Sequence, residues 1–443
     1  MDTGNTAYVL GSAALVMLMT PGLALFYGGM VRARSVLNMM MMSMVTLGVV
    51  TVVWVTVGFS LAFGDSHAGL IGGFEHAGLR STAAVGADAS GAGGIPLQAF
   101  AMFQLMFAII TGALLSGAIA DRARFWPWAL FVGLWALVVY VPMAHWIFAF
   151  DGYVGEHGGW MANALGALDF AGGTAVEINS GASALALALV LGRRRGWPRE
   201  PMRPHNLPSV LLGAGLLWFG WFGFNAGSAL AAGAVASNAF LTTMTASAAA
   251  VLSWLALEHR LDGRPTSLGA ASAAIAGLVG ITPSCGFVDT FGALAIGLLA
   301  GIACQLAIRL KYKLGYDDSL DVVAIHGVGG VVGMLMIGLV GTAAVNEAGA
   351  DGLFYGGGLL QLGKQSIAVV AAAAFAFAVT LLIAWLVKRF IGFRVEAEVE
   401  AGGIDEAEHA ETAYEFSPLT SSTSSIMGTR PSSTAAAPEE SAR

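Results

Sequence analysis

The sequence predicts an all-α polytopic membrane protein, and composition, apolar runs and charge distribution all support that class. Hydrophobic residues make up 56% of the 443 residues and charged residues only 11%, whereas a soluble chain carries about 25% charged residues. The 60 glycines lie mostly inside apolar runs, which favours close helix packing over flexible linkers. We therefore expect a lipid bilayer around most of the chain, and no nucleic acid partner.

Eleven runs are long and apolar enough to cross a bilayer as helices. The first continues to Met30 with no positively charged segment before it, so we interpret it as a span and not as a cleaved signal peptide. The predicted spans are 6–30, 36–63, 98–120, 126–149, 169–192, 207–228, 237–257, 268–285, 290–310, 320–343 and 366–389.

The connections between the spans alternate in charge. Those that follow spans 1, 3, 5, 7, 9 and 11 hold 17 of the 21 basic residues. Because positive charge is enriched on the cytoplasmic side, we predict the N-terminus outside and the C-terminus inside. We expect a multi-pass protein of the cell (plasma) membrane of a bacterium.

The order of the spans suggests an internal repeat. Five spans precede the longest basic connection, five follow it, and one is extra. An odd number of spans in each half means that the halves insert with opposite orientation. Spans 5 and 10 also begin alike, with Leu168-Asp169 and Leu320-Asp321. We therefore predict an inverted repeat of spans 1–5 and 6–10.

Glu177 and His326 are the two ionisable residues that lie deep within predicted spans. Glu177 falls about eight residues into span 5, roughly 12 Å below the surface. A charged carboxylate costs about 2.5–3.5 kcal/mol at the centre of a span. The structural interpretation is a protonated carboxyl and a packing histidine between helices. We favour the functional one, in which the two side chains meet in the middle of the membrane and mark a conduction path.

Asp169 and Asp321 each stand at the start of a predicted span. A carboxylate at the first residue of a helix commonly accepts hydrogen bonds from unpaired backbone N–H groups. A cation ligand is the alternative, and we favour structural support for both residues.

Two predicted spans carry aromatic residues at helical spacing. Phe103 and Phe107 are four residues apart in span 3, and Trp221, Phe224 and Ser228 follow at i, i+3 and i+7 in span 6. Each set alone favours packing in a lipid environment. Together, the rings and the Ser228 hydroxyl can bind a small cation by cation–π contact and one hydrogen bond.

The remaining features concern the cysteines and the C-terminus. Cys285 and Cys304 have no metal-ligand spacing, so we interpret both as small core residues and expect no metal and no cofactor. We predict a membrane domain over 1–394, an acidic cytoplasmic segment over 395–416, and a disordered Ser/Thr/Ala/Pro-rich tail over 417–443.

Several motifs spread over almost the whole chain occur together. They are Thr20-Pro21-Gly22-Leu23-Ala24-Leu25-Phe26-Tyr27-Gly28-Gly29, Phe103-Gln104 with Phe107, Ala144-His145-Trp146, Leu168-Asp169-Phe170-Ala171-Gly172-Gly173-Thr174, Trp221-Phe222-Gly223-Phe224-Asn225-Ala226-Gly227-Ser228, and Asp321 with His326-Gly327. In combination they resemble the ammonium transporter family (Amt/Mep/Rh). The resemblance implies the family's assembly and fold: a homotrimer with one pore through each subunit and an inverted repeat of spans 1–5 and 6–10.

The resemblance implies roles for these positions. Two departures also follow from it: Glu177 stands where the common pattern has the first of two pore histidines, and Phe148 where the family usually has a tryptophan. The implied roles are Phe107 and Phe224 as the gate of the outer pore, Ser228, Phe103 and Phe148 as the external ammonium site, Trp221 as pore wall, Asp169 as support of that site, and His326 as the second pore histidine.

The resemblance extends into the cytoplasmic segment. Gly403-Ile404-Asp405, His409, Glu411 and Ala413-Tyr414 resemble the part of the family that couples neighbouring subunits. In bacterial members this region and nearby loops receive a P-II-type signalling protein.

The function that follows is ammonium uptake: recruitment outside, deprotonation, and passage of ammonia with the proton relayed by the Glu177–His326 pair. The alternative is an ammonium sensor that signals through its tail. An intramembrane hydrolase is disfavoured, because we find no serine–lysine, paired-aspartate or His-Glu-x-x-His arrangement. We therefore expect a transporter and not an enzyme.

Overall fold

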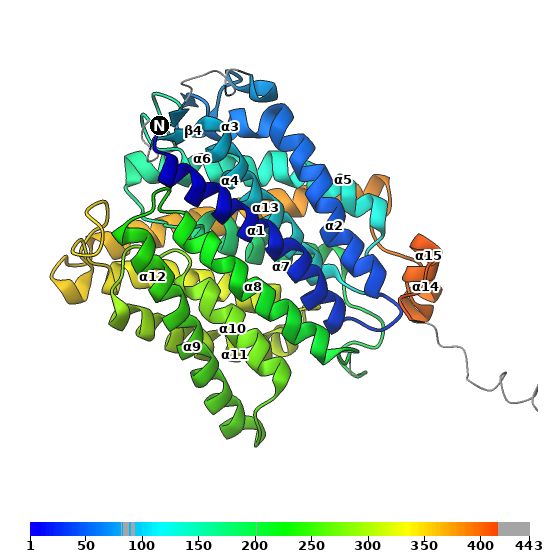
Figure 1. The fold of residues 1–443 in the computed structure, drawn as a ribbon. Helices are drawn as coiled ribbons and strands as arrows, with labels where there is room; N and C mark the ends of the chain where they lie inside the picture. The colour runs from blue at the N-terminus through cyan, green and yellow to red at the C-terminus, as the bar shows by residue number, and fades with distance from the viewer. Residues whose placement is uncertain (81, 83–87, 90–93, 201, 415–443) are drawn as a thin grey trace, which may run out of the picture.

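The computed structural model of the chain is mostly helical and describes residues 1–80, 82, 88–89, 94–200 and 202–414 (Figure 1). Ten helices in these ranges are long and apolar enough to cross a membrane, which confirms the predicted class. They are Thr3–Met30, Val36–Phe63, Leu97–Ile119, Phe125–Phe148, Gly173–Leu191, Leu207–Gly227, Ala234–Asp262, Thr290–Leu314, Val323–Val340 and Leu360–Phe390.

The predicted eighth span, 268–285, corresponds to a shorter apolar helix, α10 (Ser267–Ile281), of 15 residues. Residues 282–287 then form a turn region, and the next helix begins at Thr290. Eleven spans, their inverted repeat and their orientation therefore stay predictions, while the helical nature of all eleven segments is observed.

Several spans consist of more than one labelled element. The α-helices are α1 (Thr3–Met30), α2 (Val36–Val53), α3 (Phe59–Phe63), α4 (Leu97–Leu115), α5 (Phe125–Trp135), α6 (Val141–Phe148), α7 (Asn179–Leu191), α8 (Leu207–Gly227), α9 (Ala234–Asp262), α10, α11 (Thr290–Leu314), α12 (Gly329–Val340), α13 (Leu360–Phe390), α14 (Ala397–Gly402) and α15 (Asp405–His409). Two short antiparallel pairs, β1 (Ser66–His67) with β2 (Ile71–Gly72) and β3 (Asp88–Ala89) with β4 (Ile95–Pro96), lie in the loop between α3 and α4.

The helices form one bundle around α4. α1 lies along α8, and α9, α10 and α11 pack together beside them (Figure 1). α13 packs against α7. Nearly every residue of α4 is buried, because neighbouring helices surround an apolar element on all sides. This places α4, which carries Phe103 and Phe107, at the centre of the molecule.

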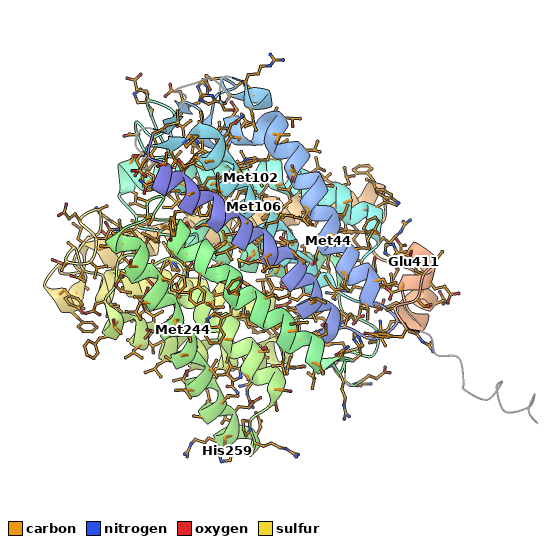
Figure 2. All side chains as sticks on the ribbon, viewed as in Figure 1. Met44, Met102, Met106, Met244, His259 and Glu411 are labelled. Atoms are coloured by element: carbon orange, nitrogen blue, oxygen red, sulfur yellow. The ribbon has the colours of Figure 1, made fainter. Side chains whose placement is uncertain are left out.

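The outer faces of the bundle are covered with apolar side chains (Figure 2). Met44 on α2 and Met244 on α9 are 44% and 47% exposed. Soluble proteins rarely expose large contiguous apolar surfaces. These faces fit a lipid environment or contact with other subunits.

Four spans contain a π-helical stretch that the sequence did not predict. They are η1 (Trp54–Gly58), η4 (Ala136–Tyr140), η6 (Gly173–Ile178) and η7 (Val323–Val328). In a π-helix the backbone bond runs from residue i to i+5, so local geometry widens. η6 opens span 5 and η7 opens span 10, so both deep ionisable residues lie in such stretches.

Spans 5 and 10 begin later than predicted. Their helices start at Gly173 and Val323, not at 169 and 320. Glu177 is therefore the fifth residue of its helix, not about the eighth. Gly172 precedes this helix with φ 117°, a left-handed conformation that glycine adopts without strain, and this turn ends the extended segment before the helix.

Candidate functional site

Glu177 and His326 meet at the centre of the bundle. Glu177 Oε2 lies 2.7 Å from His326 Nδ1, and the two residues are 0% and 4% exposed. The second carboxylate oxygen of Glu177, Oε1, is buried and has no hydrogen-bond partner within the described ranges. A buried polar atom without a partner is costly, so this oxygen is available for a ligand or a proton.

Glycines allow the helices that carry this pair to approach closely. A Cβ atom at Gly330, in span 10, would lie 2.7 Å from the Cβ of Glu177. A Cβ at Gly181, in span 5, would lie 2.2 Å from the Cα of Gly327. Any larger residue would push the two spans apart. The short Glu177–His326 contact therefore depends on glycine at these crossing points.

Two phenylalanine rings stack above this pair. The centroids of Phe107 and Phe224 lie 4.1 Å apart with an interplanar angle of 21°, and each residue is 1% exposed. Phe103 packs edge-on against Phe107 at 5.0 Å, and Trp221 lies 5.5 Å from Phe224. α4 and α8 thus bring together the aromatic faces that the sequence placed on separate spans.

A cavity of about 380 Å³, which we call the vestibule, opens on one side of the stacked rings. Phe148 and Ser228 contribute to its wall as expected, whereas Phe103 does not and packs behind Phe107. The Ser228 hydroxyl donates to the Phe224 carbonyl at 2.8 Å, so its oxygen lone pairs face elsewhere. The wall also contains residues for which the sequence predicted no role: Phe100, Gln104, Phe150, Tyr153, Phe170, Phe287 and Asn346.

The spacing of residues on α4 would have predicted part of the vestibule wall from the sequence. Phe100, Gln104 and Phe107 follow at i, i+4 and i+7 on α4, which places them on one face. An amide within an apolar span is a polar group that needs a partner or an opening. The same pattern extended backward from Phe107 would have found Phe100 and Gln104.

A second, very narrow cavity lies on the other side of the rings. It has room for about 10 Å³, roughly the minimum that one water molecule occupies. Phe224 and Trp221 form part of its wall, and Glu177 and His326 supply its ionisable groups. The other lining side chains are apolar: Met19, Leu23, Phe26, Ile110, Leu114, Val176, Leu217 and Ile275.

Hydrogen bonds hold the walls of both cavities. The Trp221 indole donates to Thr282 Oγ1 at 2.8 Å, which fixes the ring beside Phe224. Asp169 accepts from the backbone N–H groups of Gly172, Gly173 and Thr174 and from the Thr174 hydroxyl, all within 2.6–2.7 Å. This is the capping geometry expected for Asp169, and it shapes the turn that leads to Glu177.

At the start of span 10, the expected capping residue, Asp321, does not cap the helix. Asp318 accepts from the Val323 backbone N–H at 2.7 Å, whereas the Asp321 carboxylate forms an ion pair with Lys311. Asp321 has φ 65°, a left-handed backbone conformation that lies outside the helix. The capping residue of span 10 is therefore Asp318, and Asp321 supports the loop through Lys311.

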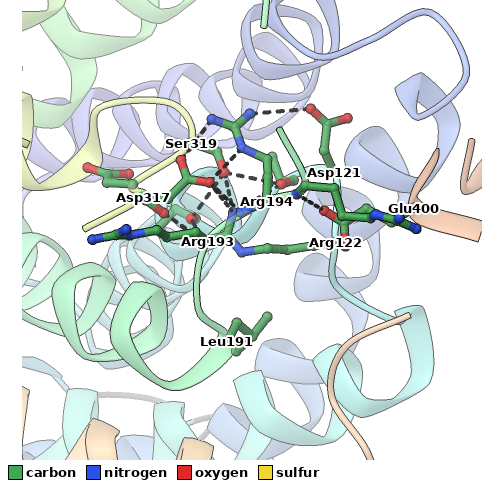
Figure 3. A network of polar contacts seen from close by, with 12 residues as sticks. Asp121, Arg122, Leu191, Arg193, Arg194, Asp317, Ser319 and Glu400 are labelled. Atoms are coloured by element: carbon green, nitrogen blue, oxygen red, sulfur yellow. Dashed lines mark hydrogen bonds and ion pairs between the residues drawn. The ribbon is translucent and has the colours of Figure 1, made fainter. Parts of the chain in front are cut away.

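A buried ionic network lies beyond the inner cavity, at the end of the bundle where spans 3, 5 and 9 finish (Figure 3). Arg194 binds Asp317 through two nitrogens at 2.9 and 3.0 Å and reaches Asp121 at 3.4 Å. Arg122 donates to the Asp317 carbonyl at 2.6 Å and to the hydroxyl of Ser319. Loops from both halves of the chain are thus joined by charge-assisted bonds.

This network changes the titration of its carboxylate. Burial by itself would raise the pKa of Asp317, but the hydrogen bonds and charge of Arg194, with the charge of Arg122, hold that pKa below its ordinary value. Burial raises the pKa of the neighbouring Asp318 to about 6, and the charge of Asp321 adds to this. The two adjacent carboxyls therefore titrate in different pH ranges.

The C-terminal segment from residue 395 to residue 414 is bound to this same end of the molecule. Glu400 accepts from the Arg195 backbone N–H at 2.7 Å. Asp405 accepts from the first backbone N–H groups of α2 at 2.8 and 3.0 Å, and Glu408 from the first of α5 at 2.9 Å. Carboxylates at helix N-termini are favoured by the unpaired N–H groups and the helix dipole.

Comparison with known proteins agrees with these observations. The pattern of the Ammonium Transporter Family matches residues 7–414. An ammonium transporter of Mycobacterium tuberculosis is 56% identical, with 94% of this chain and 91% of that protein covered. The ammonium transporter Amt1 of Archaeoglobus fulgidus is 46% identical, with 94% and 100% covered.

Solved structures show the same arrangement of helices. The crystal structure of Saccharomyces cerevisiae Mep2 has a TM-score of 0.82 and 36% identity, and covers 90% of this chain and 88% of that chain. A structure described as a sensor Amt protein has a TM-score of 0.83 and 30% identity, with 92% and 98% covered. The chain therefore belongs to the ammonium transporter family.

Proposed function

We propose that the protein takes up ammonium by separating it into ammonia and a proton at the stacked rings. The observation that carries this proposal is the buried Glu177–His326 pair, at 2.7 Å, on the wall of a narrow apolar cavity behind Phe107 and Phe224. Such a pair accepts and passes on a proton, while the cavity favours a small neutral molecule.

The vestibule is the proposed recruitment site. Phe107 and Phe148 present aromatic rings, and Ser228 presents a hydroxyl oxygen. A small cation is attracted to ring faces and hydrogen-bonds to oxygen. Phe103 supports Phe107 from behind, and Asp169 acts as structural support, with a direct cation contact as the alternative.

The proton and ammonia then take separate steps. Ammonium gives one proton to the pair and becomes ammonia, which loses far less on desolvation than the ion does. Ammonium gives its proton to the free oxygen of Glu177, Oε1, while Oε2 passes a proton to His326 Nδ1 and His326 releases the proton of Nε2, so one proton enters and one leaves. Ammonia regains a proton beyond the inner cavity, so the net cargo is ammonium.

The larger assembly follows the family resemblance. We propose eleven spans with the N-terminus outside, an inverted repeat of spans 1–5 and 6–10, and a homotrimer in the bacterial plasma membrane. Residues 1–394 form the transport domain, and 395–416 form a coupling segment that permits P-II-type binding. The segment 417–443 and residues 415–416 lie outside the described residues.

We do not favour the sensor alternative, because the arrangement of rings, vestibule and buried pair follows one path through the bundle. Transport is tested with purified protein in proteoliposomes. An ammonium concentration step on a supported membrane should give a saturable current, and labelled methylammonium should enter the vesicles. Protein that binds ammonium but gives neither signal would support the sensor.

A further inference from the structure

A groove at the side of the bundle has no part in the path described above. It measures about 460 Å³ and lies between the last residues of α7 and the last residues of α13. Its lining is formed by Leu189 and Val190 on α7 and by Trp385, Lys388 and Arg389 on α13. The three α13 residues follow at i, i+3 and i+4, which places them on one helix face.

The groove combines an apolar wall with two cations. Leu189 and Trp385 are 53% and 52% exposed, so their side chains face the surroundings of the bundle. Tryptophan is enriched where a membrane span meets the headgroup layer. Lys388 and Arg389 stand one turn beyond Trp385, toward the end of the helix, where long basic side chains reach the interface.

The charges of these two cations are not neutralised by a carboxylate in the described part of the chain. Lys388 Nζ donates to the backbone carbonyl of Val190, a neutral acceptor. Arg389 lies over the Phe390 ring at 5.8 Å. Arg394, a few residues later, differs because Glu400 pairs with it at 2.7 Å. The groove therefore keeps two positive charges beside exposed apolar surface.

We infer that this groove binds one anionic phospholipid of the cytoplasmic leaflet. Lys388 and Arg389 hold the phosphate of the headgroup, and the acyl chains lie against Leu189 and Trp385. Basic pockets between transmembrane helices on the cytoplasmic side suit such headgroups, and each nearby Lys or Arg contributes about 1 kcal/mol. The assignment to the cytoplasmic leaflet rests on the orientation given under the proposed function.

Brominated lipids test this site, because bromine on an acyl chain quenches nearby tryptophan. The full-length protein is placed in phosphatidylcholine vesicles that contain increasing amounts of brominated phosphatidylglycerol or, separately, brominated phosphatidylcholine. The difference between the protein and its Trp385→Phe variant isolates the signal of Trp385. Phosphatidylglycerol should quench that signal at a lower mole fraction than phosphatidylcholine.

Charge variants show whether the two cations cause this preference. The double variant Lys388→Gln, Arg389→Gln should weaken the preference for phosphatidylglycerol over phosphatidylcholine about 30-fold. This factor corresponds to a loss of about 2 kcal/mol, or about 1 kcal/mol for each cation. Arg389→Gln alone keeps the Lys388–Val190 bond and should weaken the preference about fivefold. The matched control is Arg260→Gln with Arg264→Gln, which removes two exposed charges from the same predicted side, at the end of α9.

The outcomes separate this inference from the proposed transport. Equal quenching by the two lipids, or an equal loss in the control variant, would overturn the lipid site. Competition by soluble glycerol phosphate at similar concentration would show a phosphate site in place of a lipid site. Ammonium currents measured in the same vesicles report transport independently, since none of the groove residues lines the vestibule or the inner cavity.

Discussion

At the scale of single residues, the energetic cost of burial explains why Glu177 and His326 could be identified from the sequence. A charge within an apolar span is rare enough to be a functional hypothesis without any structure. The contact between their side chains was harder to predict, because 149 positions separate the two residues in the sequence. Their distance in space also depends on the glycines at which spans 5 and 10 approach each other. Gln104 stands in a matching motif but received no predicted role, because its amide is uncharged and the helical pattern was not extended backward from Phe107.

The stacked rings give the first prediction at this scale. Replacing Phe107 and Phe224 together by alanine would join the vestibule to the inner cavity and admit water. We expect ammonium-driven current to change at least tenfold and to lose selectivity against potassium. The measurement is current on supported membranes with both cations, after the oligomer has been checked by size-exclusion chromatography.

A second stacked pair provides the control for this experiment. Phe222 and Phe240 lie 4.0 Å apart at 8°, away from the vestibule and the inner cavity. Their double alanine variant removes the same number of atoms, so it should keep the selectivity. If both double variants carry wild-type current, the rings at Phe107 and Phe224 serve only packing.

The ionic network gives a prediction for stability against pH. The pKa of Asp317 is lowered by Arg194 and Arg122 against the effect of burial, so its stabilising effect is complete above the unfolded pKa of about 3.9. That effect is lost as the pH falls through the lower folded pKa. Asp317→Asn should cost about 3 kcal/mol at neutral pH, because Arg122 and Arg194 are buried and lose the carboxylate they share, while Asp121 at 3.4 Å remains for Arg194.

Thermal unfolding in detergent between pH 3 and pH 8 measures this. The variant should have a lower Tm at pH 7 and a shallower decline in acid than the unmodified protein. Asp262→Asn is the control, because its pair with Arg309 is 48% and 44% exposed and such pairs contribute about 0–1 kcal/mol. Parallel acid curves for Asp317→Asn and the unmodified protein would assign the acid sensitivity to other carboxyls.

At the scale of elements, apolar length predicted the helices well, but their first turns required the structure. The sequence predicts Asp169 and Asp321 as capping residues, and the residues after them are apolar or small enough to continue a helix, so both helix starts are predicted too early. In the structure, Asp169 and Asp318 collect the free N–H groups at these two starts. The π-helical stretches η6 and η7 have no composition that distinguishes them from α-helix.

The C-terminal segment that begins at residue 395 gives the prediction at this scale. Truncation after Val399 removes Glu400, Asp405 and Glu408 and with them the caps on α2, α5 and the Arg195 loop. We expect ammonium uptake to fall severalfold and the Tm to fall. Truncation after Ser417 keeps these contacts and should leave uptake near normal. Equal uptake by the two truncated proteins would remove the coupling role of this segment.

At the scale of the whole molecule, composition predicted the membrane class because 56% of the residues are hydrophobic and only 11% are charged. Large apolar side chains such as Phe240 on α9 and Phe291 on α11 are 49% and 80% exposed. Hydropathy does not tell which of these faces meet lipid and which meet another subunit, because both environments are apolar. The trimer therefore rests on family membership.

Orientation can be tested by labelling. Cys285 and Cys304 are buried, so an introduced cysteine is the accessible thiol among the described residues. Glu156→Cys lies in the loop after span 4 and Arg199→Cys in the basic loop after span 5, and both positions are exposed. An impermeant thiol reagent should label the first in intact cells and the second only after lysis. The opposite pattern would reverse the orientation that we propose.

The central claim is that the Glu177–His326 pair carries the proton of ammonium. The most direct measurement is the current after an ammonium step, across pH 5 to 8, for Glu177→Gln and Glu177→His. Glutamine keeps the size and the hydrogen bond to His326 but does not shuttle a proton, so we predict a loss of current of at least tenfold with the fold intact. Histidine restores a titratable group, so current should persist with a shifted pH profile. Wild-type current from Glu177→Gln at every pH would contradict the claim and make Glu177 a buried structural carboxyl.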